Sequence, residues 1–117
     1  MSEVSIKQAL RRYREKTAEL LDDESFNVAT TRGKLSKSFD FTCFDKGVFK
    51  LVKVCYQTMP SKEFDDLLSY SDSQLSANTI LQIDFWDKGK RKPFYRSKLF
   101  YNQPNQVIPS DLKKLVK

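Results

Sequence analysis

The stretch "SFDFTCFDKGVFKLVKVCYQT", residues 38–58, decides the fold because it predicts a β-hairpin. Two apolar-rich runs flank a turn signal at Asp45-Lys46-Gly47. In the second run, alternation places Lys53 and Cys55 on one face of the strand, with Val and Tyr residues on the other. A strand that packs Val and Tyr inward has no need for a lysine on its other face. The face of residues 53 and 55 is therefore a candidate functional face.

Patterns on both sides of the hairpin predict the remaining elements. Residues 3–23 form an amphipathic helix, and residues 26–33 contain a short strand. After the hairpin, residues 61–77 predict a second helix, and residues 79–86 and 93–101 predict a second pair of strands. The order is helix, three strands, helix, two strands. It predicts an α/β (α+β) fold with a central mixed sheet of about five strands flanked by helices.

The end of the chain has a different composition from the rest. We expect one domain over residues 1–101 and a tail over residues 102–117 that holds two prolines and then a short basic helix. The tail is either partly disordered or a docking arm, and its apolar residues, among them Leu112, favour docking onto the domain or onto a protein partner.

Composition excludes several classes of function. The chain has 117 residues, no histidine and only two cysteines, so it lacks Ser-His and Cys-His nucleophile pairs and the ligands of a structural zinc site. We expect no cofactor and no metal. The absence of an apolar run of about eighteen residues predicts a soluble, cytoplasmic protein with no membrane partner. Cys43 and Cys55, on the two arms of the hairpin, are expected to be free, buried thiols rather than a disulfide.

The net charge of +6 favours a polyanionic partner, most often nucleic acid. The segment "KGKRKPFYRSK" mixes cations with aromatic rings, which suits phosphate contacts and base stacking. The same pattern also fits a solvated turn whose rings belong to the core. The candidate nucleic-acid contacts are Arg11, Arg12, Arg14, Arg32, Lys34, Lys37, Lys88, Lys90, Arg91, Lys92, Tyr95, Arg96 and Lys98.

The order of elements and the hairpin motif resemble the PD-(D/E)XK nuclease superfamily, and within it the archaeal Holliday junction resolvases. In that family the hairpin presents an Asp, and the next strand carries Glu-x-Lys. Here Asp40 falls on the Asp position, Lys53 on the Glu position and Cys55 on the Lys position. The resemblance covers residues 3–100 and implies a restriction-endonuclease-like fold, a two-fold homodimer and binding of branched DNA.

The departures from the motif predict a site without catalytic activity. The family's chemistry needs two carboxylates on a Mg²⁺ ion, with a lysine beside them. A cation at position 53 repels such an ion, and the thiol of Cys55 is a poor ligand for it. Asp40 facing Lys53 is better suited to an ion pair. Glu15 or Glu19 of the first helix could serve as the family's further acid.

Three functions follow as alternatives. The first is a non-catalytic nucleic-acid-binding protein on a resolvase-like, pseudo-nuclease fold. The second is a structural subunit that docks a catalytic partner in a DNA-processing complex. The third is an active metal-dependent nuclease in which Glu15, Asp45 or Asp84 replaces the missing carboxylate.

Overall fold

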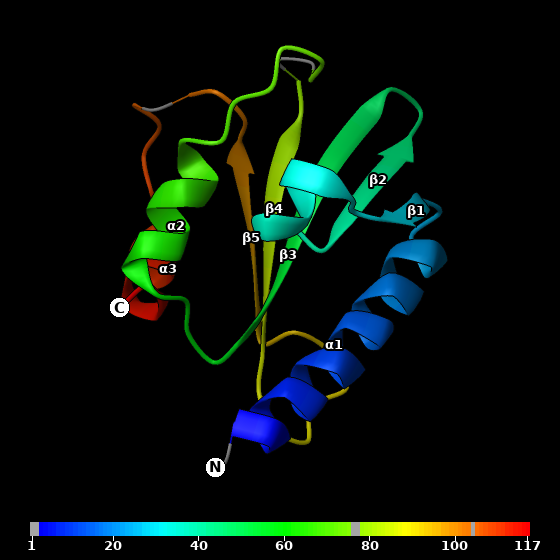
Figure 1. The fold of residues 1–117 in the computed structure, drawn as a ribbon, viewed down its shortest axis with the longest axis vertical. Coiled ribbons are helices and arrows are strands. Elements are labelled where there is room, and N and C mark those ends of the chain that lie inside the picture. The colour runs from blue at the N-terminus through cyan, green and yellow to red at the C-terminus, as the bar shows by residue number, and fades with distance from the viewer. Residues whose placement is uncertain (1–2, 76–77, 104) are drawn as a thin grey trace.

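A mixed five-stranded sheet in the order β1-β2-β3-β4-β5 forms the centre of the protein (Figure 1). The computed structural model describes residues 3–75, 78–103 and 105–117, with the backbone alone for residues 3–5. β3 and β4 run parallel, and the other neighbours are antiparallel. The predicted α+β class and the order of elements are confirmed. The strands are β1 (Asn27–Thr30), β2 (Phe41–Asp45), β3 (Val48–Tyr56), β4 (Ile80–Trp86) and β5 (Tyr95–Phe100).

The turn between β2 and β3 fixes the register of the central hairpin. Lys46 and Gly47 both have positive φ, 46° and 84°, as a two-residue turn between twisted strands requires. Asp45 therefore pairs with Val48, and Phe41 pairs with Val52. This register sends alternate side chains of β3 to opposite faces of the sheet, as the alternation predicted.

Helices cover both faces of the sheet (Figure 1). α1 (Glu3–Asp23) lies on one side, and α2 (Ser61–Leu68) and α3 (Ser110–Leu115) lie on the other. The short 3-10 helix η1 (Gly33–Lys37) leads into β2. Two groups of buried side chains result. The group under α1 includes Tyr13, Leu21, Val52, Val54 and Trp86, and the group under α2 and α3 includes Leu51, Cys55, Phe64, Leu67 and Leu112.

Aromatic rings fasten α1 to the sheet. The ring of Tyr13 stacks on Trp86 of β4, with 5.1 Å between centroids, and on Tyr56 of β3, with 5.9 Å between centroids. One turn further along the helix, the buried hydroxyl of Thr17 accepts a hydrogen bond of 2.9 Å from the Trp86 indole N–H. These contacts determine which face of α1 packs against the sheet.

The second helix is shorter than the predicted range of 61–77. α2 ends at Leu68, and the hydroxyl of Ser69 donates to the carbonyl of Asp65 at 2.8 Å. A serine that bonds nearby carbonyls competes with continued helix, which explains the early end. The chain that follows is held to the residue directly after β5, because the backbone N–H of Asp72 donates to the Tyr101 hydroxyl at 2.7 Å. Residues 76–77 lie outside the described ranges.

The tail docks onto its own domain. Leu112 of α3 is fully buried in the same core as α2, and Val116 forms a parallel bridge with Met59. The N–H of Met59 donates to the Leu115 carbonyl at 2.9 Å, and the N–H of Lys117 donates to the Met59 carbonyl at 3.0 Å. Most apolar side chains of the tail are thus used within the chain, while Val107 is 91% exposed.

Both cysteines are buried and free, as expected. No helix in the described part of the chain is long and apolar enough to cross a membrane.

Candidate binding cleft and basic surface

A cleft begins where β2 stops pairing with β3. The last pair is Phe41 with Val52, so the following residues of β3 have an open edge on that side. Asp40 partly closes this edge: its backbone N–H donates to the Val52 carbonyl at 2.7 Å, and its carboxylate Oδ2 accepts the Val54 N–H at 2.8 Å. The side chain of Asp40 therefore accepts the hydrogen bond from Val54 that a neighbouring strand would otherwise accept.

The cation beside Asp40 is Arg14 and not the predicted Lys53. The Nε of Arg14 lies 3.0 Å from Asp40 Oδ1, as an ion pair whose geometry does not align a hydrogen bond. Arg14 also takes the place expected for an acid of the first helix. Glu15 turns instead toward Arg11, with 3.7 Å between Oε1 and Nε, and both of these side chains are largely exposed.

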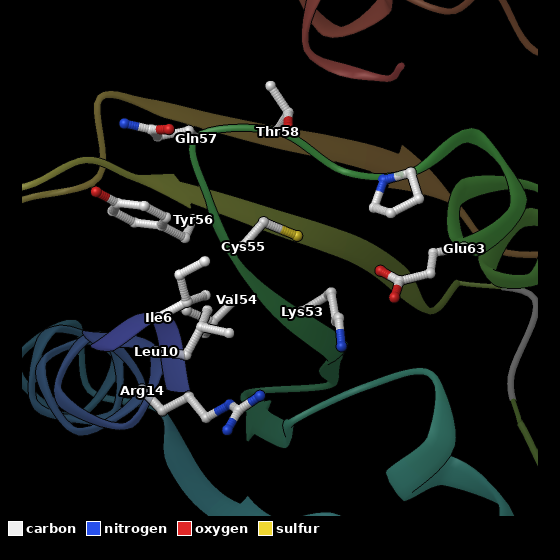
Figure 2. Close-up of a pocket in the computed structure, with 11 residues that line it drawn as sticks. Ile6, Leu10, Arg14, Lys53, Val54, Cys55, Tyr56, Gln57, Thr58 and Glu63 are labelled. Atoms are coloured by element: carbon white, nitrogen blue, oxygen red, sulfur yellow. The ribbon is translucent and has the colours of Figure 1, made fainter. Parts of the chain in front are cut away.

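The cleft has a volume of about 700 Å³ and lies between α1, the end of β3 and the start of α2 (Figure 2). Figure 2 shows Lys53, Cys55 and Glu63 on one side of β3, and Arg14 with Val54 and Tyr56 on the other. Ile6 and Leu10 of α1 complete its apolar wall, and Gln57, Thr58 and Pro60 form its far end.

Two smaller hollows adjoin this cleft. One, of about 600 Å³, is lined by Arg11, Arg14, Glu15 and Asp40 among others. The other, of about 240 Å³, is lined by Lys37, Lys53, Glu63 and Asp66 among others. Because Arg14 and Lys53 each line two hollows, the cations of α1, η1 and β3 that were predicted separately lie along one groove.

The thiol of Cys55 lies at the bottom of the cleft and is unreactive. Its burial raises its pKa to about 12, while the charge of nearby Lys53 acts in the opposite direction. Glu63 and Asp40 add to the rise and Arg14 opposes it, so four charged groups surround this sulfur. Since the thiolate is the reactive form, Cys55 does not act as a nucleophile near neutral pH.

The carboxylates considered as replacement metal ligands are scattered. Asp45 lies at the hairpin turn, and Asp84 is fully buried in β4. Glu15 shares a hollow with Asp40 but pairs with Arg11. Within residues 3–75, 78–103 and 105–117, no three His, Cys, Asp or Glu side chains gather as a metal site.

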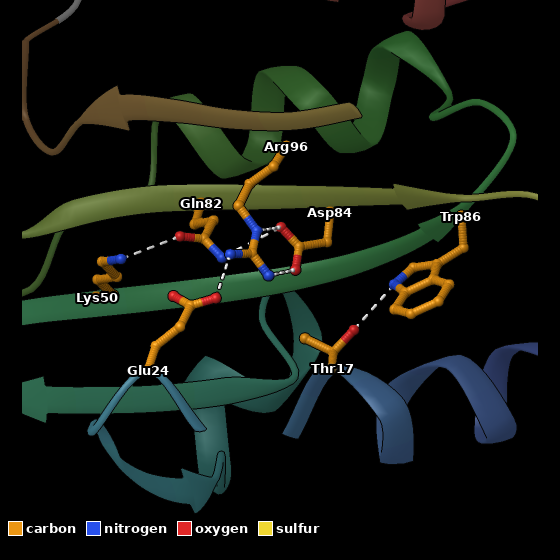
Figure 3. A network of polar contacts seen from close by, with 7 residues as sticks. All are labelled: Thr17, Glu24, Lys50, Gln82, Asp84, Trp86 and Arg96. Carbon is orange, nitrogen blue, oxygen red and sulfur yellow. Dashed lines mark hydrogen bonds and ion pairs between the residues drawn. The ribbon is translucent and has the colours of Figure 1, made fainter. Parts of the chain in front are cut away.

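Asp84 belongs to a second cluster of charges, called here the buried network (Figure 3). Arg96 binds Asp84 through two hydrogen bonds of 2.9 and 3.1 Å and Glu24 through one of 2.6 Å. Gln82 donates to Asp84 at 3.1 Å and accepts from Lys50 at 3.3 Å. Burial raises the pKa of Asp84, against the hydrogen bond from Arg96, and burial lowers the pKa of Lys50.

The strongest concentration of positive charge lies on the loop between β4 and β5. The side chain of Lys16 on α1 donates to the Lys90 carbonyl at 3.4 Å. The loop thus lies against α1 beside Arg12. The basic surface comprises Arg12 and Lys16 of α1 with the exposed loop residues Lys88, Lys90, Arg91 and Lys92.

The rings of this hairpin differ in exposure. Phe94 is 46% exposed, whereas Tyr95 is half-buried against Phe85, with 6.1 Å between ring centroids. Tyr95 was predicted to contact nucleic acid, but Phe94 is the more accessible ring. Lys16 was not among the residues predicted to contact nucleic acid, although its position four residues after Arg12 places both on one helix face.

The remaining predicted contacts lie away from the basic surface. Arg32 is exposed directly before η1, Lys34 is exposed within η1, and Lys98 is exposed on β5. Arg96 has a different role, because its guanidinium is bound by Asp84 and Glu24 and its side chain is only 24% exposed. We therefore leave Arg96 out of the binding surface.

The scan against protein-family models gives no match, and the searches of curated proteins and of solved structures give none either.

Proposed function

We propose that this protein is a non-catalytic, cytoplasmic DNA-binding protein that holds branched or otherwise structured DNA through its basic surface. The observation that supports this best is the joining of α1 and the β4–β5 loop. The hydrogen bond from Lys16 to the Lys90 carbonyl brings the cations of the loop next to those of α1, two segments that are distant in sequence. Such a surface suits the closely spaced phosphates of a nucleic acid.

The composition of the cleft supports a role without catalysis. At the positions that resemble a nuclease motif, Asp40 pairs with Arg14, Lys53 supplies a second cation and Cys55 is a buried thiol. Arg14 and Lys53 next to Asp40, the one carboxylate at these positions, disfavour a divalent ion, because the site gains charge repulsion and loses ligands; Glu63 is the other carboxylate that lines the cleft. The chain is accordingly proposed to be a degenerate relative of the PD-(D/E)XK nucleases.

Binding to a panel of labelled DNAs tests this function. Single-stranded, duplex and four-way-junction DNA are titrated with the protein, once in EDTA and once in Mg²⁺. We expect binding in both conditions, strongest for the junction, and intact DNA throughout. Metal-dependent cleavage that disappears in Asp40→Ala would establish the active nuclease instead, and no binding to any of the DNAs would favour the structural subunit.

Restoring the motif tests the proposed relationship. The variant Arg14→Glu, Lys53→Glu and Cys55→Lys places two acids and a lysine around Asp40. We expect it to bind Mn²⁺ in calorimetry, whereas the wild-type protein does not. A control with Arg11→Glu, Lys62→Glu and Cys43→Ala changes similar residue types outside the main cleft. A folded restored variant that binds no Mn²⁺ would count against the alignment.

A further inference from the structure

The cleft combines a fixed aromatic ring, an open strand edge and two cations. We propose that it binds one unpaired nucleotide without a metal ion, with the base against Tyr56 and the phosphate near Arg14 and Lys53. The inference rests on the proposed function and names the part of the nucleic acid that enters this cleft. Its volume of about 700 Å³ lies within the range of small-molecule sites.

The wall for the base is held rigidly. Tyr56 lines the cleft and is half-buried, and the ring of Tyr13 lies nearly parallel to it at 10°. Tyr13 is in turn stacked on the buried Trp86 at 13°. A ring fixed in this way loses little conformational entropy when a base stacks on it. Ile6 and Leu10 extend the same apolar wall.

The strand edge offers hydrogen bonds to a base. Successive residues of a strand direct their N–H and C=O groups to alternate sides. Because the Val54 N–H points to the side where β2 has ended, the Val54 carbonyl and the Tyr56 N–H point there too. One donor and one acceptor therefore face the cleft beside the ring of Tyr56, as the edge of an unpaired base requires.

The far wall of the cleft is fixed by an uncommon turn. Gln57 has a φ of 64°, a region that residues other than glycine rarely adopt. The Gln57 N–H donates to the Trp86 carbonyl at 2.7 Å, and its side-chain amide donates to Asp87 Oδ1 at 2.9 Å. The Thr58 N–H donates to the Tyr56 carbonyl at 2.7 Å. Strain that is held by neighbouring bonds is a common property of binding sites.

The two cations are available to a phosphate. The side chain of Arg14 is 41% exposed and lines the cleft, and its contact with Asp40 is through Nε. Lys53 has no ion pair within the described ranges. Glu63, the opposing carboxylate, is exposed in the first turn of α2. A phosphate can therefore accept charge-assisted hydrogen bonds from both cations.

A titration with deoxyadenosine monophosphate tests the site independently of strand binding. In ¹⁵N–¹H spectra we expect shifts of the Val54 and Tyr56 amides and of Arg14 Nε–H. Tyr56→Leu and Lys53→Gln should each weaken the affinity roughly fivefold or more, while the matched controls Phe44→Leu and Lys62→Gln leave it unchanged. Lys53→Gln keeps the test valid if Tyr56→Leu fails to fold. The same shifts with inorganic phosphate alone would overturn the proposed base contact.

A DNA strand that carries 2-aminopurine distinguishes a nucleotide within DNA from a free nucleotide as the occupant of the cleft. With this fluorescent base in a single-stranded 12-mer, we expect quenching on binding that is lost in Tyr56→Leu. Quenching supports a nucleotide within a strand, and mononucleotide shifts without quenching support a free nucleotide in the same cleft. If the strand binds but neither signal appears, the cleft proposal is wrong and the proposed function stands. If the mononucleotide binds but no DNA does, the proposed function is wrong and the cleft proposal stands.

Discussion

The protein has two clusters of mixed charge, and they differ in access to solvent. In the buried network, Asp84 is fully buried and Lys50 is 4% exposed, and each is hydrogen-bonded. In the cleft, Arg14 and Lys53 are partly exposed beside a large hollow. A buried charge must be paired for the fold to survive, whereas an exposed one can exchange water for a ligand. Similar residue types are thus part of the buried core in one place and are proposed to bind a ligand in the other.

The largest effect on stability is expected from Asp84→Ala. It leaves the guanidinium of Arg96 partly unpaired in the buried network, which should cost about 3–5 kcal/mol of unfolding free energy. Urea unfolding monitored by circular dichroism measures this. Arg11→Ala, which breaks an exposed pair, is the control and should cost at most about 1 kcal/mol. Equal losses of unfolding free energy in the two variants would contradict the proposed difference between buried and exposed charges.

Thr17→Val should have the next largest effect. The change keeps the shape of the side chain but leaves the buried Trp86 indole N–H without its acceptor, which costs about 1–3 kcal/mol. Thr17→Ser retains the hydroxyl and serves as the matched control. If the valine and serine variants unfold at the same urea concentration, the hydrogen bond does not help to fasten α1.

Lys50→Met should give a smaller effect that depends on pH. Burial lowers the pKa of Lys50 below 10.5, so the unfolded chain binds more protons and the wild-type protein gains stability as the pH rises toward 10.5. Methionine has no such dependence. We expect Lys50→Met to be relatively more stable near pH 7 than near pH 9.5, by urea unfolding at each pH. A stability difference that stays constant would contradict the lowered pKa.

The smallest signal is expected in thiol labelling, because neither cysteine of the folded protein should react. Burial raises the pKa of Cys43, near the buried network, to about 11 and that of Cys55, under the cleft, to about 12. Both thiols should therefore stay protonated at about pH 8 and react with iodoacetamide only as the chain unfolds. Mass spectrometry distinguishes the two sites. Rapid labelling of Cys55 alone would show that the cleft reaches deeper than the structure indicates.

Local patterns predicted the sheet well, because the turn at Lys46-Gly47 and the alternation along β3 depend only on near neighbours. They indicated Lys53 as the partner of Asp40 and did not identify Arg14, because Arg14 lies on the first helix, distant in sequence from the hairpin. They also failed to separate Arg96 from the exposed cations, because burial in a network depends on Glu24 and Asp84, which are distant in sequence.

The salt dependence of DNA binding tests the central proposal most directly. Fluorescence anisotropy with a labelled four-way junction gives the slope of log affinity against log salt for the wild-type protein and for Lys90→Ala, Arg91→Ala and Lys92→Ala combined. Each lost phosphate contact lowers the slope by roughly 0.9, so we predict a reduction of about two to three. The variant should keep its stability, because these side chains are exposed on a loop. An unchanged slope in the folded variant would contradict the proposal that the basic surface holds DNA.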